Sequence, residues 1–128
     1  MMYRRMLKSK IHRARVTHAD LDYEGSITLS SELLRASNIL PFEAVHVWNV
    51  TAGTRFETYA IEGALQSRAV CVNGAAAHLV TPGDIIIIAS FMQLLDENCQ
   101  DYVPTVVFVD ESNGIQEIRR ECPVILAS

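Results

Sequence analysis

Hydrophobic and polar positions alternate along most of the chain, in short segments separated by turn residues. Residues 44–50 and 55–61 alternate regularly, and Thr51-Ala52-Gly53-Thr54 between them has the composition of a turn. This pattern predicts a β-hairpin. The same criteria predict further strands at residues 69–72, 85–89 and 104–109.

The N-terminal segment from Met6 to Thr17 also has the texture of a strand, because apolar residues are interleaved with charged ones. The alternation slips between Ile11 and Ala14, which predicts a β-bulge. The unbroken β-branched run at residues 85–88 is typical of a strand buried on both faces.

One short helix is predicted at residues 31–37. Ser30 is a suitable N-cap, Asn38 a suitable stop, and Pro41 prevents any continuation. Six or so short strands with frequent turns therefore predict a mainly β fold, a small six-stranded β-barrel with short helices. Residues 122–128 show no clear periodicity, and the segment from about 115 to 128 is predicted to be a mobile tail.

Composition bounds the class of protein. The 128 residues are 49% hydrophobic with a net charge of −4, which fits one folded domain over residues 1–128 and excludes a disordered polar chain. The longest apolar run, Ile85 to Ala89, is too short to span a membrane as a helix.

The three cysteines are widely spaced and have no metal-ligand partners in the sequence, so no disulfide framework and no metal site are predicted. No signal peptide is recognisable. A reducing, cytoplasmic setting is expected.

Six of the eleven basic residues precede the first acidic residue, Asp20. Such a cluster can neutralise nucleic-acid phosphates, or belong to an acid-poor transit peptide. The interleaved apolar residues favour an ordered strand whose cations face a pocket or solvent. The basic residues are Arg4, Arg5, Lys8, Lys10, Arg13 and Arg15.

Few motifs carry chemistry directly. We find no phosphate-binding loop, Ser-His-Asp signature or paired-carboxylate motif, and no glycine-rich loop that would hold the phosphate of a lysine-bound pyridoxal cofactor. A Gly25-Ser26 pair lies at a predicted turn after the basic strand. From local sequence alone, this turn is an ordinary hairpin tip.

Several linked segments between about Met6 and Met92 change that interpretation. They are Val16-Thr17-His18-Ala19-Asp20-Leu21-Asp22-Tyr23-Glu24-Gly25-Ser26, Val47-Trp48-Asn49-Val50, Arg55-Phe56-Glu57-Thr58-Tyr59-Ala60-Ile61, Val72-Asn73-Gly74-Ala75-Ala76-Ala77-His78 and Pro82-Gly83-Asp84-Ile85-Ile86-Ile87-Ile88-Ala89. Together, and at a matching chain length, these segments resemble bacterial aspartate α-decarboxylase.

The resemblance implies a double-psi β-barrel that assembles as a homotetramer and cuts its own chain before a serine. Here that bond is Gly25-Ser26, giving fragments 1–25 and 26–128 and a pyruvoyl cofactor derived from Ser26, with or without a helper protein. Glycine before the serine suits the scheme, because it tolerates positive φ and exposes its carbonyl to attack.

The resemblance also implies roles for neighbouring residues. Thr58 would donate a hydrogen bond to the oxyanion formed during cleavage, and Tyr59 would protonate the substrate carbon after CO2 leaves. Adjacent residues lie on opposite sides of an ideal strand, so this pair implies a local twist or a site between strands. Arg55 and Lys10 would bind the carboxylates of aspartate. Lys10 is also implied to be catalytic, and Thr58 also to bind substrate.

Further residues are implied to contact or line the substrate site, and no nucleic acid or membrane partner is expected. Small side chains let backbone N–H groups approach a ligand closely. Asn73, Gly74, Ala75 and Ala76 match the family's substrate-contacting segment, and His12 and Trp48 are candidates for lining the site.

The function implied is decarboxylation of L-aspartate to β-alanine and CO2, through an imine with the pyruvoyl carbonyl, for pantothenate and coenzyme A synthesis. Two alternatives stay open at this point. One is a small β-barrel that binds nucleic acid through its basic N-terminal strand. The other is an uncleaved, inactive relative of the enzyme.

Overall fold

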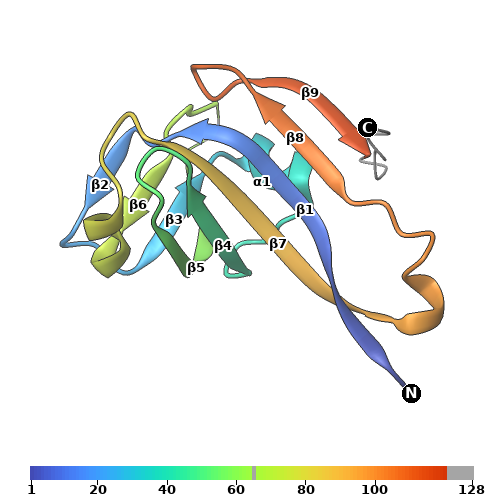
Figure 1. The fold of residues 1–128 in the computed structure, drawn as a ribbon. Coiled ribbons are helices and arrows are strands. Elements are labelled where there is room, and N and C mark those ends of the chain that lie inside the picture. The colour runs from blue at the N-terminus through green and yellow to red at the C-terminus, as the bar shows by residue number, and fades with distance from the viewer. Residues whose placement is uncertain (65, 121–128) are drawn as a thin grey trace.

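The computed structural model describes residues 1–64 and 66–120, and β-strands dominate it (Figure 1). The elements in chain order are β1 (Tyr3–Arg15), β2 (His18–Asp20), β3 (Ser26–Leu29), α1 (Ser31–Ser37), β4 (Ala44–Asn49), β5 (Arg55–Glu62), β6 (Cys71–Asn73), the 3₁₀ helix η1 (Gly74–Leu79), β7 (Ile85–Leu95), the 3₁₀ helix η2 (Asp96–Asn98), β8 (Thr105–Val109) and β9 (Ile115–Arg120).

The strands close into a barrel. Their order is β2-β6-β3-β5-β4-β7-β1-β8-β9, and β2 follows β1 after only Val16 and Thr17. The Val16 N–H donates to the Asp84 carbonyl at 2.9 Å, and the Thr17 N–H donates to the Val70 carbonyl at 2.8 Å. The two residues between β1 and β2 are therefore hydrogen-bonded to the segment before β7 and to the segment before β6. Counted as one strand, β1 and β2 complete a six-stranded barrel with β3 to β7. The predicted mainly β barrel with short helices is confirmed.

β1 and β7 form the longest antiparallel pair, and they run side by side beyond the barrel toward the N-terminus (Figure 1). Their register shifts between Ile11 and Ala14, where Arg13 has a φ of 65°, which confirms the predicted bulge. β7 continues past the predicted end at Ala89, because its later residues keep pairing with the start of β1.

The predicted helix is confirmed as α1. The Ser30 hydroxyl accepts a hydrogen bond from the Leu33 N–H at 3.1 Å, and Asn38 ends the helix in the left-handed conformation. Leu33 and Leu34 are buried, and the helix lies against β1 and β8.

The core fills the barrel interior with aliphatic side chains that alternate along the strands. In β7, Ile86 and Ile88 are fully buried, whereas Ile85 and Ile87 are half-buried. The prediction of burial on both faces was therefore wrong for Ile85 and Ile87, because they point to the outer face of the barrel. The fully buried large side chains are Ile11, Ile27, Leu29, Leu33, Val45, Val47, Val70, Val72, Ile86, Ile88, Val106 and Val107.

The C-terminal hairpin lies outside the six-stranded barrel. β8 pairs in parallel with β1 and antiparallel with β9, so the prediction of a tail from residue 115 was wrong for residues 115–120. All side chains of β9 are exposed, so its sequence shows none of the alternation that marks a half-buried strand. The rest of the predicted tail, residues 121–128, lies outside the described residues.

Asn113 fastens this hairpin to the barrel. Its Oδ1 accepts from the Arg15 N–H at 2.7 Å, and its Nδ2 donates to the carbonyls of Arg15 at 2.9 Å and Arg68 at 3.0 Å. The side chain is buried, and its amide therefore replaces a backbone group in the pairing.

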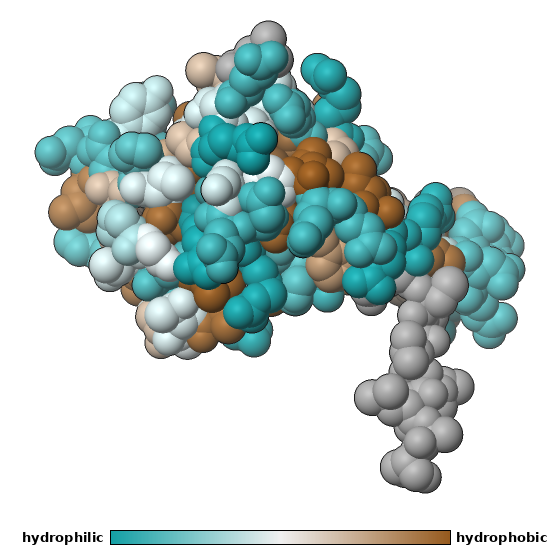
Figure 2. Space-filling view, turned by 90° about the horizontal axis from the view of Figure 1, so that it is seen from above, coloured by the Kyte–Doolittle hydropathy of each residue, from teal (hydrophilic) through white to brown (hydrophobic). Residues whose placement is uncertain are grey.

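The surface seen from above carries apolar residues in separate groups among hydrophilic ones (Figure 2). In the part of the chain that is described, no helix is long and apolar enough to cross a membrane.

Candidate active site

The turn that holds Gly25 is not a hairpin tip. β2 pairs with β6 in parallel and β3 pairs with the opposite edge of β6 antiparallel. The segment 21–25 between them therefore crosses over the end of β6, where β6 gives way to η1. The local interpretation as a hairpin tip was wrong, because β2 is too short to be recognised in the sequence and its pairing partner is distant.

Gly74 makes this crossing possible. Its φ is +72°, and a Cβ built on it would lie 2.6 Å from the Cα and 2.7 Å from the N of Gly25. Real Cβ atoms do not approach that closely, so only glycine fits here. The sequence placed Asn73-Gly74 at a turn, and the structure brings that turn against the Gly25-Ser26 bond.

Ser26 is the first residue of β3 and is buried, with 1% of its surface exposed. Its hydroxyl donates to the Glu24 carbonyl at 3.1 Å and accepts from Nδ2 of Asn73 at 3.0 Å. The same Nδ2 donates to Oγ1 of Thr28 at 3.1 Å. The hydroxyl is therefore held by two hydrogen bonds, one to the backbone just before Gly25 and one from a side chain of β6.

A cavity of about 540 Å³ opens beside Ser26. Tyr59 of β5 lines it, and Phe42 faces Tyr59 with a ring-centroid distance of 6.3 Å. The cavity is lined by Tyr23, Glu24, Ser26, Pro41, Phe42, Tyr59, Ile61 and Glu62.

Phe42 is a cavity residue that sequence reasoning missed. It is 77% exposed and has a φ of 72°, a conformation that is costly for a bulky residue. Its N–H donates to the Ala60 carbonyl at 2.6 Å, so the backbone of Phe42 is tied to β5 next to Tyr59. An aromatic residue directly after Pro41 was the available signal.

Thr58 and Tyr59 point to opposite faces of β5, as expected for adjacent residues. In the parallel β3–β5 register Ile27 pairs with Ala60, so Thr58 lies on β5 two positions before the partner of Ile27. Tyr59 lines the cavity, whereas Thr58 is not among the residues that line it. The structure therefore places Tyr59, but not Thr58, in the lining of the cavity beside Ser26.

The basic residues that were expected to bind the substrate lie away from the cavity beside Ser26. Lys10, Trp48 and Arg55 occupy outward positions on β1, β4 and β5, next to inward Ile11, Val47 and Phe56. The Arg55 guanidinium lies 5.4 Å from the Trp48 ring centroid. None of these expected residues lines the cavity beside Ser26.

The remaining candidates divide between the two regions. Ala75 and Ala76 follow Gly74 in η1, near the crossing. His12 lies at the β1 bulge, where its ring makes an edge contact with Phe108 at 5.4 Å and lines a separate hollow of about 460 Å³.

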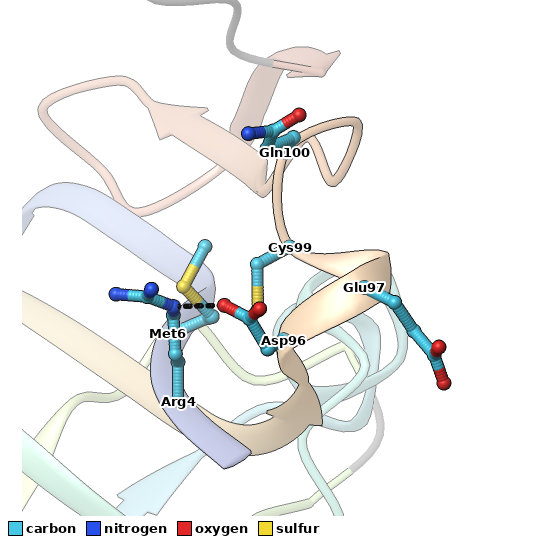
Figure 3. A pocket seen from close by; sticks show the side chains of 6 residues that line it. All are labelled: Arg4, Met6, Asp96, Glu97, Cys99 and Gln100. Atoms are coloured by element: carbon cyan, nitrogen blue, oxygen red, sulfur yellow. Dashed lines mark hydrogen bonds and ion pairs between the residues drawn. The ribbon is translucent and has the colours of Figure 1, made fainter. Parts of the chain in front are cut away.

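A further cavity of about 550 Å³ lies between the start of β1 and η2 (Figure 3). Arg4 and Asp96 form an ion pair of 2.5 Å across it. None of the candidate site residues lines this cavity, so it is separate from the Ser26 site. Among residues 1–64 and 66–120, no group of three or more His, Cys, Asp or Glu side chains could hold a metal ion.

A small β-barrel with a buried serine hydroxyl at a chain crossing thus defines the site, and comparisons with known proteins place it in a family. The sequence profile of the family described as aspartate decarboxylase matches residues 2–116. The chain is 72% identical over 121 residues to the aspartate 1-decarboxylase of Legionella pneumophila (strain Lens), covering 94% of this chain and 91% of that protein.

Other relatives with the same name are more distant. The aspartate 1-decarboxylase of Syntrophotalea carbinolica is 59% identical, covering 88% of this chain and 86% of that protein. The chain also aligns with the crystal structure of the rationally designed mkDPBB_sym_86 protein, with a TM-score of 0.46 and 11% identity, over 62% of this chain and 91% of the other. That likeness is too distant to support an argument.

The chain belongs to the aspartate decarboxylase family, as its linked motifs indicated.

Proposed function

We propose that this protein converts L-aspartate to β-alanine and CO2 after cleaving its own chain at Gly25-Ser26, and so supplies β-alanine for pantothenate synthesis. One observation carries the proposal. The buried Ser26 hydroxyl is held by Asn73 and Glu24 at a glycine-lined crossing, directly beside a cavity that contains Tyr59. Family membership supports the same activity.

The first step of cleavage is attack by the Ser26 hydroxyl oxygen on the Gly25 carbonyl carbon. The C–N bond breaks, an ester forms in place of the amide, and the nitrogen of Ser26 becomes a free amine. Amide resonance opposes this shift, so the chain must hold the hydroxyl close to the carbonyl. The Ser26 hydroxyl donates to the carbonyl of Glu24, one residue before Gly25, and this hydrogen bond keeps the hydroxyl near the chain that precedes the bond to be cleaved.

The second step removes the Cα proton of Ser26 and breaks the bond between its Cβ and Oγ. The Gly25 carboxylate leaves, and one water molecule then replaces nitrogen at the resulting dehydroalanine and releases ammonia. The products are a chain ending at Gly25 and a chain beginning with a pyruvoyl group.

Thr58 is proposed to stabilise the oxyanion of the first step. It lies on β5, the strand that pairs with β3, two positions before the partner of Ile27, and the Gly25 carbonyl oxygen would become the oxyanion. A hydroxyl donor at such an oxygen stabilises the transition state more than the resting amide.

The residues around Ser26 fit a pyruvoyl group. Residue 26 is buried, faces the Asn73 amide and borders a cavity about 540 Å³ in volume. When present, a pyruvoyl carbonyl condenses with an amine and draws electrons from the carbon that loses CO2. Tyr59 lines this cavity and would give a proton to that carbon.

The carboxylates of aspartate need cations, and we propose that a second copy of the chain supplies them. Arg55 shares the outer face of β5 with Tyr59 but precedes it by four residues, roughly 13 Å along a strand. Lys10 lies on β1, which is separated from β5 by β4 and β7. A homotetramer would bring Arg55 and Lys10 of one copy to the Ser26 cavity of another.

The test is incubation of the purified protein with L-aspartate, followed by quantification of β-alanine and CO2 in equal amounts. The Ser26→Ala variant is the matched control, because it keeps the fold and lacks the hydroxyl. Equimolar β-alanine and CO2 from the parent alone supports the proposal. No β-alanine from a chain that has been shown to be cleaved would overturn the assigned substrate.

A further inference from the structure

A cysteine that the proposed reaction does not use contacts the side chain that holds Ser26. The Cys71 thiol donates to Oδ1 of Asn73, with the sulfur 3.1 Å from the oxygen. Both residues belong to β6, and their side chains share one face because they are two positions apart. Cys71 is thus connected to Ser26 through a single intervening side chain.

Both ends of the Asn73 amide have hydrogen-bond partners in this arrangement. Its side chain is buried, with 3% of the residue exposed. Nδ2 donates to Oγ of Ser26 and to Oγ1 of Thr28, while Oδ1 accepts from Cys71. Since an amide offers two N–H donors and one carbonyl oxygen, the thiol selects which end faces Ser26.

The opposite orientation of the amide would have different chemical consequences. Rotated by half a turn, Oδ1 would face the hydroxyls of Ser26 and Thr28, and Nδ2 would face a thiol, which is only a weak acceptor. The Ser26 hydroxyl would then be able to donate to Oδ1 and turn away from the Glu24 carbonyl.

The orientation matters because negative charge develops on Oγ of residue 26 twice during cleavage. It develops when the hydroxyl loses its proton during attack, and again when the bond between Cβ and Oγ breaks. An N–H donor facing Oγ stabilises that charge, whereas a carbonyl oxygen repels it.

We propose that Cys71 is a positioning residue for the self-cleavage chemistry, because its thiol holds the Asn73 amide with an N–H toward Oγ of Ser26. The inference rests on the proposed function, since it concerns the rate of that cleavage. Burial, with a smaller contribution from the Asp20 carboxylate, raises the pKa of the Cys71 thiol. The group therefore stays protonated at neutral pH and remains a donor.

The experiment follows cleavage of freshly purified full-length chains by mass spectrometry under denaturing conditions, together with the Tm of each chain. Cys71→Ala removes the donor and is expected to slow cleavage about tenfold, the value of one ordinary hydrogen bond. Cys71→Ser restores a donor and should cleave within about twofold of the parent. A purely structural role would instead lower the Tm without selective rescue of the cleavage rate by serine.

A double variant tests whether Cys71 acts through Asn73. If it does, adding Cys71→Ala to Asn73→Ala should slow cleavage no further. Where Cys71→Ala fails to fold, Cys71→Val gives a β-branched side chain of similar size without a donor. Unchanged cleavage in the alanine or valine variant, or equally slow cleavage in the serine variant, overturns the role of Cys71 alone. A parental chain that never cleaves overturns this inference together with the proposed function.

Discussion

Gly74 packs directly against Gly25, and a Cβ on Gly74 would lie 2.6 Å from the Cα of Gly25. The contact joins the residue after β6 to the residue whose carbonyl is attacked in the proposed cleavage. We therefore expect Gly74→Ala to displace the Gly25-Ser26 bond and to slow cleavage by roughly tenfold or more, because small misplacements of reacting groups are costly. A time course of fragment formation measures this rate.

Gly53→Ala is the matched control for this prediction. Gly53 has a similar φ of +78°, but a Cβ added to it would have nothing within 4 Å. This variant should lose only the roughly 1 kcal/mol that a left-handed conformation costs a residue with a side chain, and should cleave normally. Normal cleavage in Gly74→Ala would show that the crossing does not position the bond.

Thr58→Ala is expected to slow self-cleavage by roughly 10²–10³-fold, the effect of removing one oxyanion donor, or about 2.7–4 kcal/mol of transition-state stabilisation. Thr58→Ser keeps the hydroxyl and should cleave close to the parental rate. The fraction of cleaved chain against time, measured by intact mass, distinguishes them. Maturation of Thr58→Ala at the parental rate would remove Thr58 from the mechanism.

Arg55→Ala should cleave normally yet show a raised KM for aspartate or no turnover, because the substrate would lose a bidentate partner for one carboxylate. Kinetics on the cleaved variant measure this directly. Unchanged aspartate kinetics would exclude Arg55 from the site.

Mixing variants tests whether two copies share the site. Co-expressed Ser26→Ala and Arg55→Ala chains should be more active than either variant alone, since a mixed oligomer can join an intact Ser26 cavity to an intact Arg55. Inactive mixed oligomers would place both groups in the site of one copy.

Glu43 anchors the loop that carries Phe42, and its carboxylate should make stability depend on pH. The carboxylate accepts from Lys8 Nζ at 2.7 Å, from the Leu40 N–H at 3.1 Å and from the Ser90 hydroxyl. Burial raises the pKa of Glu43, but these hydrogen bonds outweigh it and hold the pKa below its ordinary value of 4.5. The folded state therefore gains stability above pH 4.5, and that gain is lost as the pH falls through the lowered pKa.

Glu43→Gln should accordingly reduce the free energy of unfolding by about 1–2 kcal/mol at pH 7 and by much less at low pH, where the parental carboxyl is already protonated. Chemical denaturation at the two pH values measures the difference. Glu57→Gln on β5 is the control, because Glu57 is exposed and its carboxylate lies 3.5 Å from Nε2 of the His46 ring. Equal losses for Glu43→Gln at both pH values would contradict this account.

The sequence predicted correctly those features that depend on residues close together in the chain. The Ser30 cap, the Asn38 stop and the slip between Ile11 and Ala14 each reflect neighbouring residues, and each was found where predicted. β2, β3 and β9 were missed, because β2 and β3 have only three and four residues and β9 has no buried face. Their existence depends on pairing with distant strands, which periodicity does not encode.

The site was predictable only in part for the same reason. The linked motifs singled out Gly25, Ser26, Asn73 and Gly74, and the structure brings these four together. The position of Phe42 depends on a left-handed backbone and a hydrogen bond to β5, neither of which the local sequence indicates. The separation of Lys10 and Arg55 from Ser26 follows from the strand order, which only the fold reveals.

The central claim is that the chain makes its own carbonyl cofactor from Ser26. The most direct measurement is the intact mass of the purified protein under denaturing conditions, with and without hydroxylamine, which traps reactive carbonyls. We predict two fragments that meet between Gly25 and Ser26, the second of which gains mass with hydroxylamine. A single chain of 14.3 kDa that never cleaves, even after warming or with cell extract, would contradict the account.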